Sequence, residues 1–448
     1  MNTTISFAVA IAFAACQAPA LRAAETPVAP ISTRPLEWAE ADLSERMMDG
    51  AHTFVERKMA EAPSKRGQFW NRDFSSVEDY EKSIQPNRER LREIVGAMDK
   101  RLPAQMERHG DDRWPALVAE TPRYRVHQVR WPVLEGFWGA GLLAQPKENA
   151  VARVIVVPDA DQTPEQLLGL APGIAPEEQA ARLLVENGCE VIVPVTISRA
   201  KLATEDKNLS RSDQTHREWI YRQAFHMGRH VIGYEVQTVL AAVDWFASQA
   251  GGQKIGICGW AEGGLVALHA AALDPRIDTA LVSGYFDTRQ QVWSEPIYRN
   301  VWSRLREFGD AEVAALILPR ALIIEHSAAP AVTDHKGALQ TAKFASVRTE
   351  AERIETGGLF ARPMLVRGAG GGTVRPWSAQ SLRGFLRALG LAHFAAASAD
   401  PPADRRTDFD PEPRHQRYFK EMENHVQQLL QRSEHARDQA FLFKVMPE

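Results

Sequence analysis

The chain has 448 residues, of which 44% are hydrophobic and 25% are charged, so it can bury a large core as one big domain with extensions or as two domains. Its 53 basic and 57 acidic residues give a formal net charge of -4, which provides no broad positive field for a phosphate backbone. We therefore expect no nucleic-acid partner. The three cysteines, Cys16, Cys189 and Cys258, indicate no disulfide framework.

The first 24 residues have the pattern of an export signal. The apolar run Ile5 to Ala15 is followed by small residues, and Ala18 to Ala20 or Leu21 to Ala23 fits a cleavage site. The run is too short to span a bilayer, and we expect no transmembrane segment. We predict a signal peptide at residues 1–24 and an exported protein, periplasmic or secreted. Two alternatives stay open, a buried N-terminal helix that is not removed and lipid attachment at Cys16.

Residues 34–115 are predicted to form a helical N-terminal extension. Between Glu37 and Arg101 the apolar residues recur at three- and four-residue spacing, which is the period of two or three amphipathic helices. The intervening segment Gly67 to Phe74 (GQFWNRDF) combines aromatic and polar side chains, which would suit a ligand site or a loop pinned onto a neighbouring surface. We favour the pinned loop.

Alternating strands and helices are predicted over residues 120–395. Tyr124 to Trp131 and Phe137 to Ala144 alternate apolar and polar residues, as the two arms of a hairpin do. Val151 to Val157 and Glu190 to Ile197 are β-rich runs on either side of a predicted helix. This order indicates a parallel crossover unit.

A long helical pattern covers Thr215 to Ala247, with Gly228 and Gly233 as candidate breaks. His226 and His230 are four residues apart, the spacing that places two imidazoles on one helical face for zinc. The glutamate of an H-E-x-x-H motif and a nearby third ligand are missing, so packing or surface roles are favoured for both histidines. We expect neither a metal nor a cofactor.

The segment Gln253 to Ala267 (QKIGICGWAEGGLVA) is predicted to be a strand, a sharp turn and a helix, because a β-branched run breaks at glycines and continues as an alanine-rich stretch. In hydrolases with a nucleophile elbow, such a turn has the pattern G-x-S-x-G. Here Gly259 to Gly263 (GWAEG) has both glycines and no serine. An alanine has no lone pair with which to attack a carbonyl carbon, so Ala261 marks a degenerate nucleophile position.

The acid and base of such a hydrolase follow later strands, in the chain order nucleophile, acid, base. The later elements are predicted at Thr279 to Gly284, Arg320 to Glu325 and Pro363 to Arg367 for strands, and at Tyr298 to Ile317 and Trp377 to Leu389 for helices. Asp287 and Glu325 are the candidate acids by position. The run Gly368 to Thr373 (GAGGGT) after the last strand contains no histidine. His326 is no substitute, because adjacent side chains of a strand point to opposite faces and Glu325 could not orient it.

The segment after this region has two parts. Residues 396–413 are rich in proline and aspartate, a linker-like composition. Residues 414–448 have a helical pattern whose apolar side indicates a docking surface. We expect this C-terminal helix to pack elsewhere than on the sheet domain.

Several segments resemble one branch of a known superfamily. Glu262 to Leu265 (EGGL), Ala272 to Asp278 (ALDPRID), Val282 to Phe286 (VSGYF) and Arg229 to Val236 (RHVIGYEV) resemble the dienelactone hydrolase and acetyl xylan esterase-like branch of the α/β-hydrolases. The chain looks most like the leading, often degenerate domain of large exported bacterial proteins in which a second hydrolase domain follows. The resemblance implies an α/β-hydrolase fold, a mostly parallel sheet flanked by helices, with a helical N-terminal extension and a C-terminal helix.

The loop Pro158 to Pro164 (PDADQTP) has the place of the loop that lends an N–H to the oxyanion hole of a hydrolase. It has no glycine, and Asp159 and Asp161 would oppose a developing oxyanion by charge repulsion. The residues expected to line the substrate cleft are Asp159, Ala160, Trp260 and Glu262.

Two functions stay open. The first is a non-catalytic binding or scaffold domain that holds a carbohydrate ester or a second hydrolase domain, because the serine nucleophile and the triad histidine are missing. The second is a secreted carboxylic ester hydrolase that acts on acetylated carbohydrate or similar esters through an unrecognised nucleophile. Glu262, Asp287 and Glu325 could also act as paired carboxylates on a sugar, although surface or capping roles are favoured for them.

Overall fold

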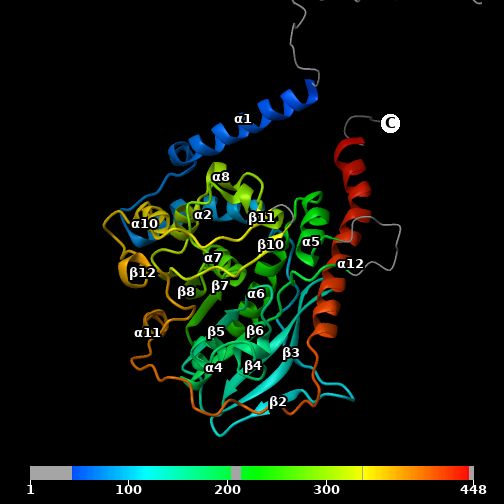
Figure 1. The fold of residues 1–448 in the computed structure, drawn as a ribbon, viewed down its shortest axis with the longest axis vertical. Coiled ribbons are helices and arrows are strands. Elements are labelled where there is room, and N and C mark those ends of the chain that lie inside the picture. The colour runs from blue at the N-terminus through cyan, green and yellow to red at the C-terminus, as the bar shows by residue number, and fades with distance from the viewer. Residues whose placement is uncertain (1–42, 203–212, 335–336, 443–448) are drawn as a thin grey trace, which may run out of the picture. The chain divides into compact units, whose positions relative to one another are not determined.

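The computed structural model describes residues 43–202, 213–334 and 337–442. The predicted signal peptide at residues 1–24 lies outside these ranges. Contacts divide the chain into two units, residues 1–55 and 56–448. The N-terminal part of helix α1 (Leu43–Lys65) belongs to the first unit, and the other labelled elements belong to the second (Figure 1). Within the described ranges, no helix has both the length and the apolar character that a membrane crossing needs.

A ten-stranded sheet forms the centre of the second unit, in the order β1-β3-β4-β6-β5-β7-β8-β9-β12, with β2 paired to β3. Its strands are β1 (Glu107–Arg108), β2 (Leu117–Glu120), β3 (Tyr124–Leu134), β4 (Phe137–Pro146), β5 (Ala152–Val157), β6 (Cys189–Pro194), β7 (Ile255–Trp260), β8 (Ile277–Ser283), β9 (Ala321–Glu325) and β12 (Met364–Val366). The pairs from β6 through β12 are parallel, whereas the pairs among β1 to β4 and the β4–β6 pair are antiparallel. A separate hairpin joins β10 (Thr333–Asp334) to β11 (Gly337–Ala338). The predicted mostly parallel sheet is confirmed.

Helices cover both faces of this sheet. The helices of this unit are α2 (Val77–Ile94), α3 (Pro164–Leu167), α4 (Ala180–Glu186), α5 (His216–Phe225), α6 (Val231–Ser248), α7 (Glu262–Leu273), α8 (Arg304–Glu307), α9 (Asp310–Ala315), α10 (Phe344–Glu352), α11 (Ala379–Ala388) and α12 (Glu412–Arg437). Neighbouring residues of β5 point to opposite faces: Ile155 and Val157 pack in one core with α6 and α7, while Val154 and Val156 pack in the other with α4 and α11. Because both faces are covered, the central strands are continuous Val- and Ile-rich runs.

The helical predictions are confirmed in part. The long pattern from Thr215 to Ala247 is two helices, α5 and α6, which separate near Gly228, whose φ of 63° is left-handed. The predicted helix from Tyr298 to Ile317 is wrong, because only the short α8 and α9 form there. Ser303 takes a left-handed φ of 59°, and Gly309 is extended, so a continuous helix cannot pass through either residue.

Helix α2 and the loop before it belong to the main core. The α2 side chains Tyr80, Ile84 and Leu91 are fully buried among core residues. In the predicted pinned loop, Trp70 donates its indole N–H to the Glu307 carbonyl oxygen at 3.1 Å, and its ring contacts the ring of Phe308. This loop is pinned, as predicted. The end of the range 34–115 is not helical, because β1 already pairs with the sheet there.

The expectation that the C-terminal helix packs elsewhere is wrong. Helix α12 contacts β4 and α5 of the same domain, and four of its side chains lie in the core, namely Tyr418, Phe419, Met422 and Val426. The apolar face that indicates docking therefore docks within the chain. The preceding segment, residues 396–413, is also attached to the sheet domain, because Arg405 donates its backbone N–H to Val118 O at 2.8 Å.

Candidate functional site

The turn between β7 and α7 has the backbone of a nucleophile elbow. Ala261 lies between the two elements with φ 51° and ψ -111°, a conformation that residues other than glycine rarely adopt. Its N–H donates to Ser283 O at 3.0 Å, and the residue is 0% exposed. The predicted strand, turn and helix are confirmed, and a buried methyl group stands where a nucleophile would stand.

Two glycines allow this turn because the chain passes close to itself on both sides. A Cβ atom at Gly259 would lie 2.0 Å from Gly263 O. A Cβ atom at Gly263 would lie 2.1 Å from Val157 O, at the end of β5. The two glycines of the sequence pattern therefore serve close packing of strand against helix, whatever residue stands between them.

A carboxylate occupies the position to which the elbow's oxyanion donors point. In such an elbow the donors are the N–H after the nucleophile and an N–H of the loop after an earlier strand. Here Glu262 N donates to Asp159 Oδ1 at 3.1 Å, and Asp161 N donates to Asp159 Oδ2 at 3.4 Å. Asp159 is 1% exposed, so this carboxylate is enclosed by protein.

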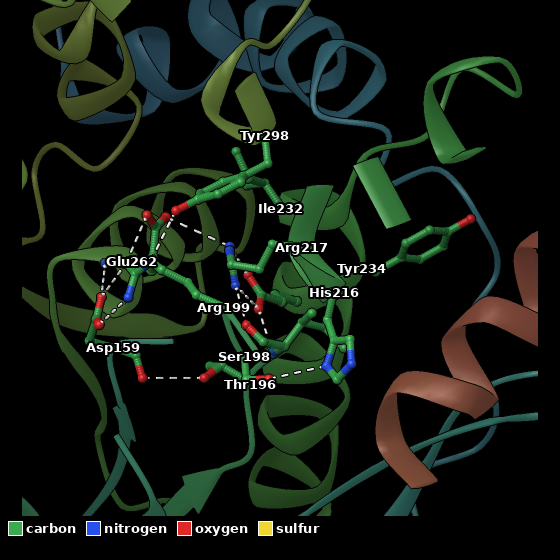
Figure 2. A network of polar contacts seen from close by, with 12 residues as sticks. Asp159, Thr196, Ser198, Arg199, His216, Arg217, Ile232, Tyr234, Glu262 and Tyr298 are labelled. Atoms are coloured by element: carbon green, nitrogen blue, oxygen red, sulfur yellow. Dashed lines mark hydrogen bonds and ion pairs between the residues drawn. The ribbon is translucent and has the colours of Figure 1, made fainter. Parts of the chain in front are cut away.

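Arg199 joins the acidic side chains of this region into one network (Figure 2). Its guanidinium group binds both oxygens of Asp159, at 2.6 and 2.9 Å, and also reaches Asp161 Oδ2 at 2.9 Å and Glu262 Oε1 at 3.2 Å. Its Nε donates to the Tyr298 hydroxyl at 2.9 Å. Burial lowers the pKa of Arg199, but Asp159 and Glu262 outweigh it and raise the pKa overall.

Glu262 is the acidic centre of the same network. Arg299 Nε donates to Glu262 Oε1 at 2.8 Å, and Arg217 Nη2 lies 3.7 Å from Oε2. Burial raises the pKa of Glu262, but Arg299, Arg217 and Arg199 outweigh it and bring the pKa to about 2. Arg217, which is 0% exposed, also pairs with Glu235 through bonds of 2.7 and 2.9 Å. Glu262 is therefore held ionised by fixed cations, which leaves it unable to exchange a proton near neutral pH.

The residues predicted to line a cleft have little contact with solvent. Asp159, Ala160 and Glu262 are 1%, 0% and 1% exposed, because the ion pairs and the strand ends enclose them. Trp260 is half-buried and donates its indole N–H to Ala328 O at 2.9 Å. Asp159 and Glu262 meet in the closed network beside the elbow, whereas the Trp260 side chain is hydrogen-bonded outside it.

The candidate acids are engaged elsewhere. Glu325, 2% exposed, accepts hydrogen bonds from Ser283 Oγ (2.5 Å), Ser378 Oγ (2.6 Å), and the N–H groups of Trp377 and Ser378 (both 2.9 Å). Asp287 accepts from Thr288 N at 2.8 Å and from the Ser346 hydroxyl. In the described part of the chain, no histidine is hydrogen-bonded to either carboxylate.

The histidines are likewise placed by packing. His326 directs both ring nitrogens at backbone carbonyls, Gly372 O at 3.2 Å and Ala342 O at 2.9 Å, so Glu325 does not orient it, as predicted. His230 caps α6, because its Nδ1 accepts a hydrogen bond from Ile232 N at 3.1 Å. His226 is exposed on the preceding turn. Over residues 43–202, 213–334 and 337–442, no group of three or more His, Cys, Asp or Glu side chains could hold a metal.

Sequence reasoning missed the arginines that hold this network, and also a serine–histidine contact. Ser198 Oγ lies 3.2 Å from His216 Nδ1 (Figure 2). The His216 ring stacks on the ring of Phe419, with 4.2 Å between the ring centroids. Arg199 directly follows Ser198 in the segment after β6. Polar residues soon after a buried strand are a sequence signal that could have indicated both side chains as candidate site residues. Among residues 43–202, 213–334 and 337–442, no carboxylate is hydrogen-bonded to this imidazole, so within those ranges the pair has no third member of a catalytic triad.

Comparisons with known proteins agree with the architecture. No protein-family model matches the chain, and no curated protein sequence matches it. Among solved structures, a proposed acetyl xylan esterase from Bacteroides fragilis is similar with a TM-score of 0.51 and 14% identity, over 75% of this chain and 89% of that one. A glucuronoyl esterase from Solibacter usitatus has a TM-score of 0.46 and 11% identity, over 70% and 94% of the two chains.

The first of these likenesses, together with the parallel sheet, the helices on both faces and the elbow at the carboxyl end of β7, establishes the architecture. The chain has the α/β-hydrolase fold, the fold of acetyl xylan esterase-like proteins.

Proposed function

We propose that the chain is a non-catalytic α/β-hydrolase-fold domain that acts by binding a partner. The observation that carries the proposal is the side chain at the elbow. Ala261 places a methyl group, 0% exposed, where covalent ester hydrolysis needs an activated hydroxyl or thiol. A methyl group cannot form a bond to the carbonyl carbon of a substrate.

The region where a hydrolase carries its base supports the same proposal. Between Arg367 and Ser378 the sequence has no histidine. Glu325, at the end of β9, is saturated by serine hydroxyls and backbone N–H groups, so it is not free to orient an imidazole from another element. A hydroxyl group added at position 261 would therefore keep its proton near neutral pH.

A protein surface is a better candidate ligand than a carbohydrate ester bound at the elbow. To reach the elbow, a sugar ester would have to break the buried ion pairs of Asp159 and Glu262 with Arg199. We therefore favour a scaffold for a second hydrolase domain. Where the natural reading frame continues into such a domain, the two domains produced separately are expected to form a complex in sedimentation velocity. Two independent species would contradict the scaffold role.

The catalytic half of the proposal is tested on the purified chain and its Ala261→Ser variant. Both proteins are assayed on an activated acetyl ester and labelled with a fluorophosphonate probe, beside an active serine esterase as the positive control. We expect no saturable turnover and no stoichiometric label for either protein. Turnover of the unmodified chain that a single substitution abolishes would instead favour the carboxylic ester hydrolase with an unrecognised nucleophile.

We also propose export, because of the apolar run and the small residues within residues 1–24. Cells that express the full chain are expected to release a shortened form outside the cytoplasm, whereas cells that express a chain without these residues retain it. Equal retention of both forms would contradict export.

A further inference from the structure

The carboxylate of Asp159 is held as a protein holds a bound anion (Figure 2). Each oxygen accepts one backbone N–H and one guanidinium N–H: Oδ1 from Glu262 N at 3.1 Å and Arg199 Nη2 at 2.9 Å, and Oδ2 from Asp161 N at 3.4 Å and Arg199 Nη1 at 2.6 Å. A forked guanidinium and the N–H groups at a helix start are the donors with which proteins bind free carboxylates. Four donors from three separate elements therefore converge on one two-oxygen anion.

We propose that the oxyanion position of this elbow is a binding site for a small monocarboxylate, and that Asp159 fills it as a built-in ligand. This proposal rests on the proposed function, because a working hydrolase would need this position free. When Asp159 is shortened, the site takes a carboxylate of matching size from solution.

The surroundings favour such replacement. Without the Asp159 carboxylate, the N–H groups of Glu262 and Asp161 lose their acceptor. The Glu262 N–H is buried, and a buried N–H without a partner costs about as much as a lost hydrogen bond. Arg199 would still pair with Asp161, whose side chain is 52% exposed, and with Glu262. Glu262 also pairs with Arg217 and Arg299. An entering carboxylate restores both the charge and the hydrogen bonds of the native site.

Size provides a sharp test. The variant Asp159→Ala removes a carboxylate group, and its vacated space matches formate. The variant Asp159→Gly removes a CH₂ group as well, and its space also admits acetate. We expect formate to raise the unfolding midpoint of Asp159→Ala by about 2 °C or more, saturably and with millimolar affinity, and acetate to act on Asp159→Gly more than on Asp159→Ala.

Three controls isolate the site. Sodium chloride at equal ionic strength measures the non-specific salt effect on each protein. The unmodified chain is expected to show no response beyond this effect, because its own carboxylate fills the site. Asp161→Ala is the matched variant, since it removes a partner of Arg199 and leaves Asp159 in place, and it is also expected to show no specific response.

Equal responses of Asp159→Ala and the unmodified chain, or no response of either Asp159 variant, would overturn the inference. If the variants do not accumulate as folded protein, refolding yield in formate against chloride replaces the thermal midpoint, and no gain in formate is again a negative result. Ester turnover by the unmodified chain would overturn the proposed function, whereas a missing formate response with no turnover would overturn the carboxylate site alone.

Discussion

Two buried carboxylates near the elbow are stabilised in different ways. Glu262, at the start of α7, is surrounded by the guanidinium groups of three arginines, whereas Glu325, at the end of β9, accepts hydrogen bonds from neutral hydroxyl and N–H donors. Both side chains are 2% exposed or less, so both have lost the solvation of water. The comparison teaches that the positions around the elbow are closed by two separate sets of partners, one of charges and one of hydrogen bonds.

The largest expected effect comes from breaking the charged set. In Arg217→Met, Glu235 and Glu262 stay buried with one cation fewer, and we expect the free energy of unfolding to fall by about 3–5 kcal/mol. Arg432→Met is the control, since Arg432 and its partner Glu135 are 61% and 71% exposed and such pairs are worth about 1 kcal/mol or less. Guanidinium unfolding curves give both values. Equal losses for the two variants would contradict the assigned role of burial.

Acid is expected to weaken the charged set next. The pKa of Glu262 is about 2 in the folded protein, against an ordinary value of 4.5. Because the folded value is the lower one, the stabilisation is complete above about pH 4.5 and is lost as the pH falls toward about 2. This group adds up to about 1.4 kcal/mol per pH unit to the slope in that window. Unfolding curves between about pH 5 and 3 should show a shallower slope for Glu262→Gln than for the unmodified chain.

A smaller loss is expected when the neutral set is changed. In Glu325→Gln, one carboxylate oxygen becomes an NH₂ group that faces donors, so at least one buried hydrogen bond is lost, at about 1–3 kcal/mol. Asp287→Asn is the control, because Asp287 is only half-buried. Chemical unfolding of both variants measures the difference. A loss for Glu325→Gln above that of Arg217→Met would reverse the comparison between the two sets.

Local patterns were enough to predict the fold and the elbow. The β-branched runs, the hairpin around Glu135 and Gly136 and the glycines at 259 and 263 each specify their own backbone, so they can be recognised in the sequence. The network could not be predicted, because Asp159, Arg199, Glu262 and Arg299 come from four separate segments whose meeting depends on the tertiary fold. For the same reason, the apolar face of α12 indicated that this helix docks on another surface, but the sequence did not indicate that the surface is formed by β4 and α5.

The smallest expected effect separates elbow strain from ordinary packing, through two alanine-to-glycine changes, one in the turn before α7 and one inside that helix. Ala261 and Ala270 are both 0% exposed, but Ala261 holds φ 51° and ψ -111°, whereas Ala270 lies inside α7. Ala270→Gly is expected to lower the free energy of unfolding by about 1–2 kcal/mol, because glycine weakens a helix interior and leaves a methyl-sized void. In Ala261→Gly the loss of the buried methyl group and the greater freedom of glycine in the unfolded chain are offset by relief of backbone strain worth about 1–3 kcal/mol, so the net change stays within about 1 kcal/mol of zero. Urea unfolding of the two variants gives the difference directly. If Ala261→Gly costs as much as Ala270→Gly, the elbow stores no strain, and its backbone is simply the conformation that the close contacts of Gly259 and Gly263 impose.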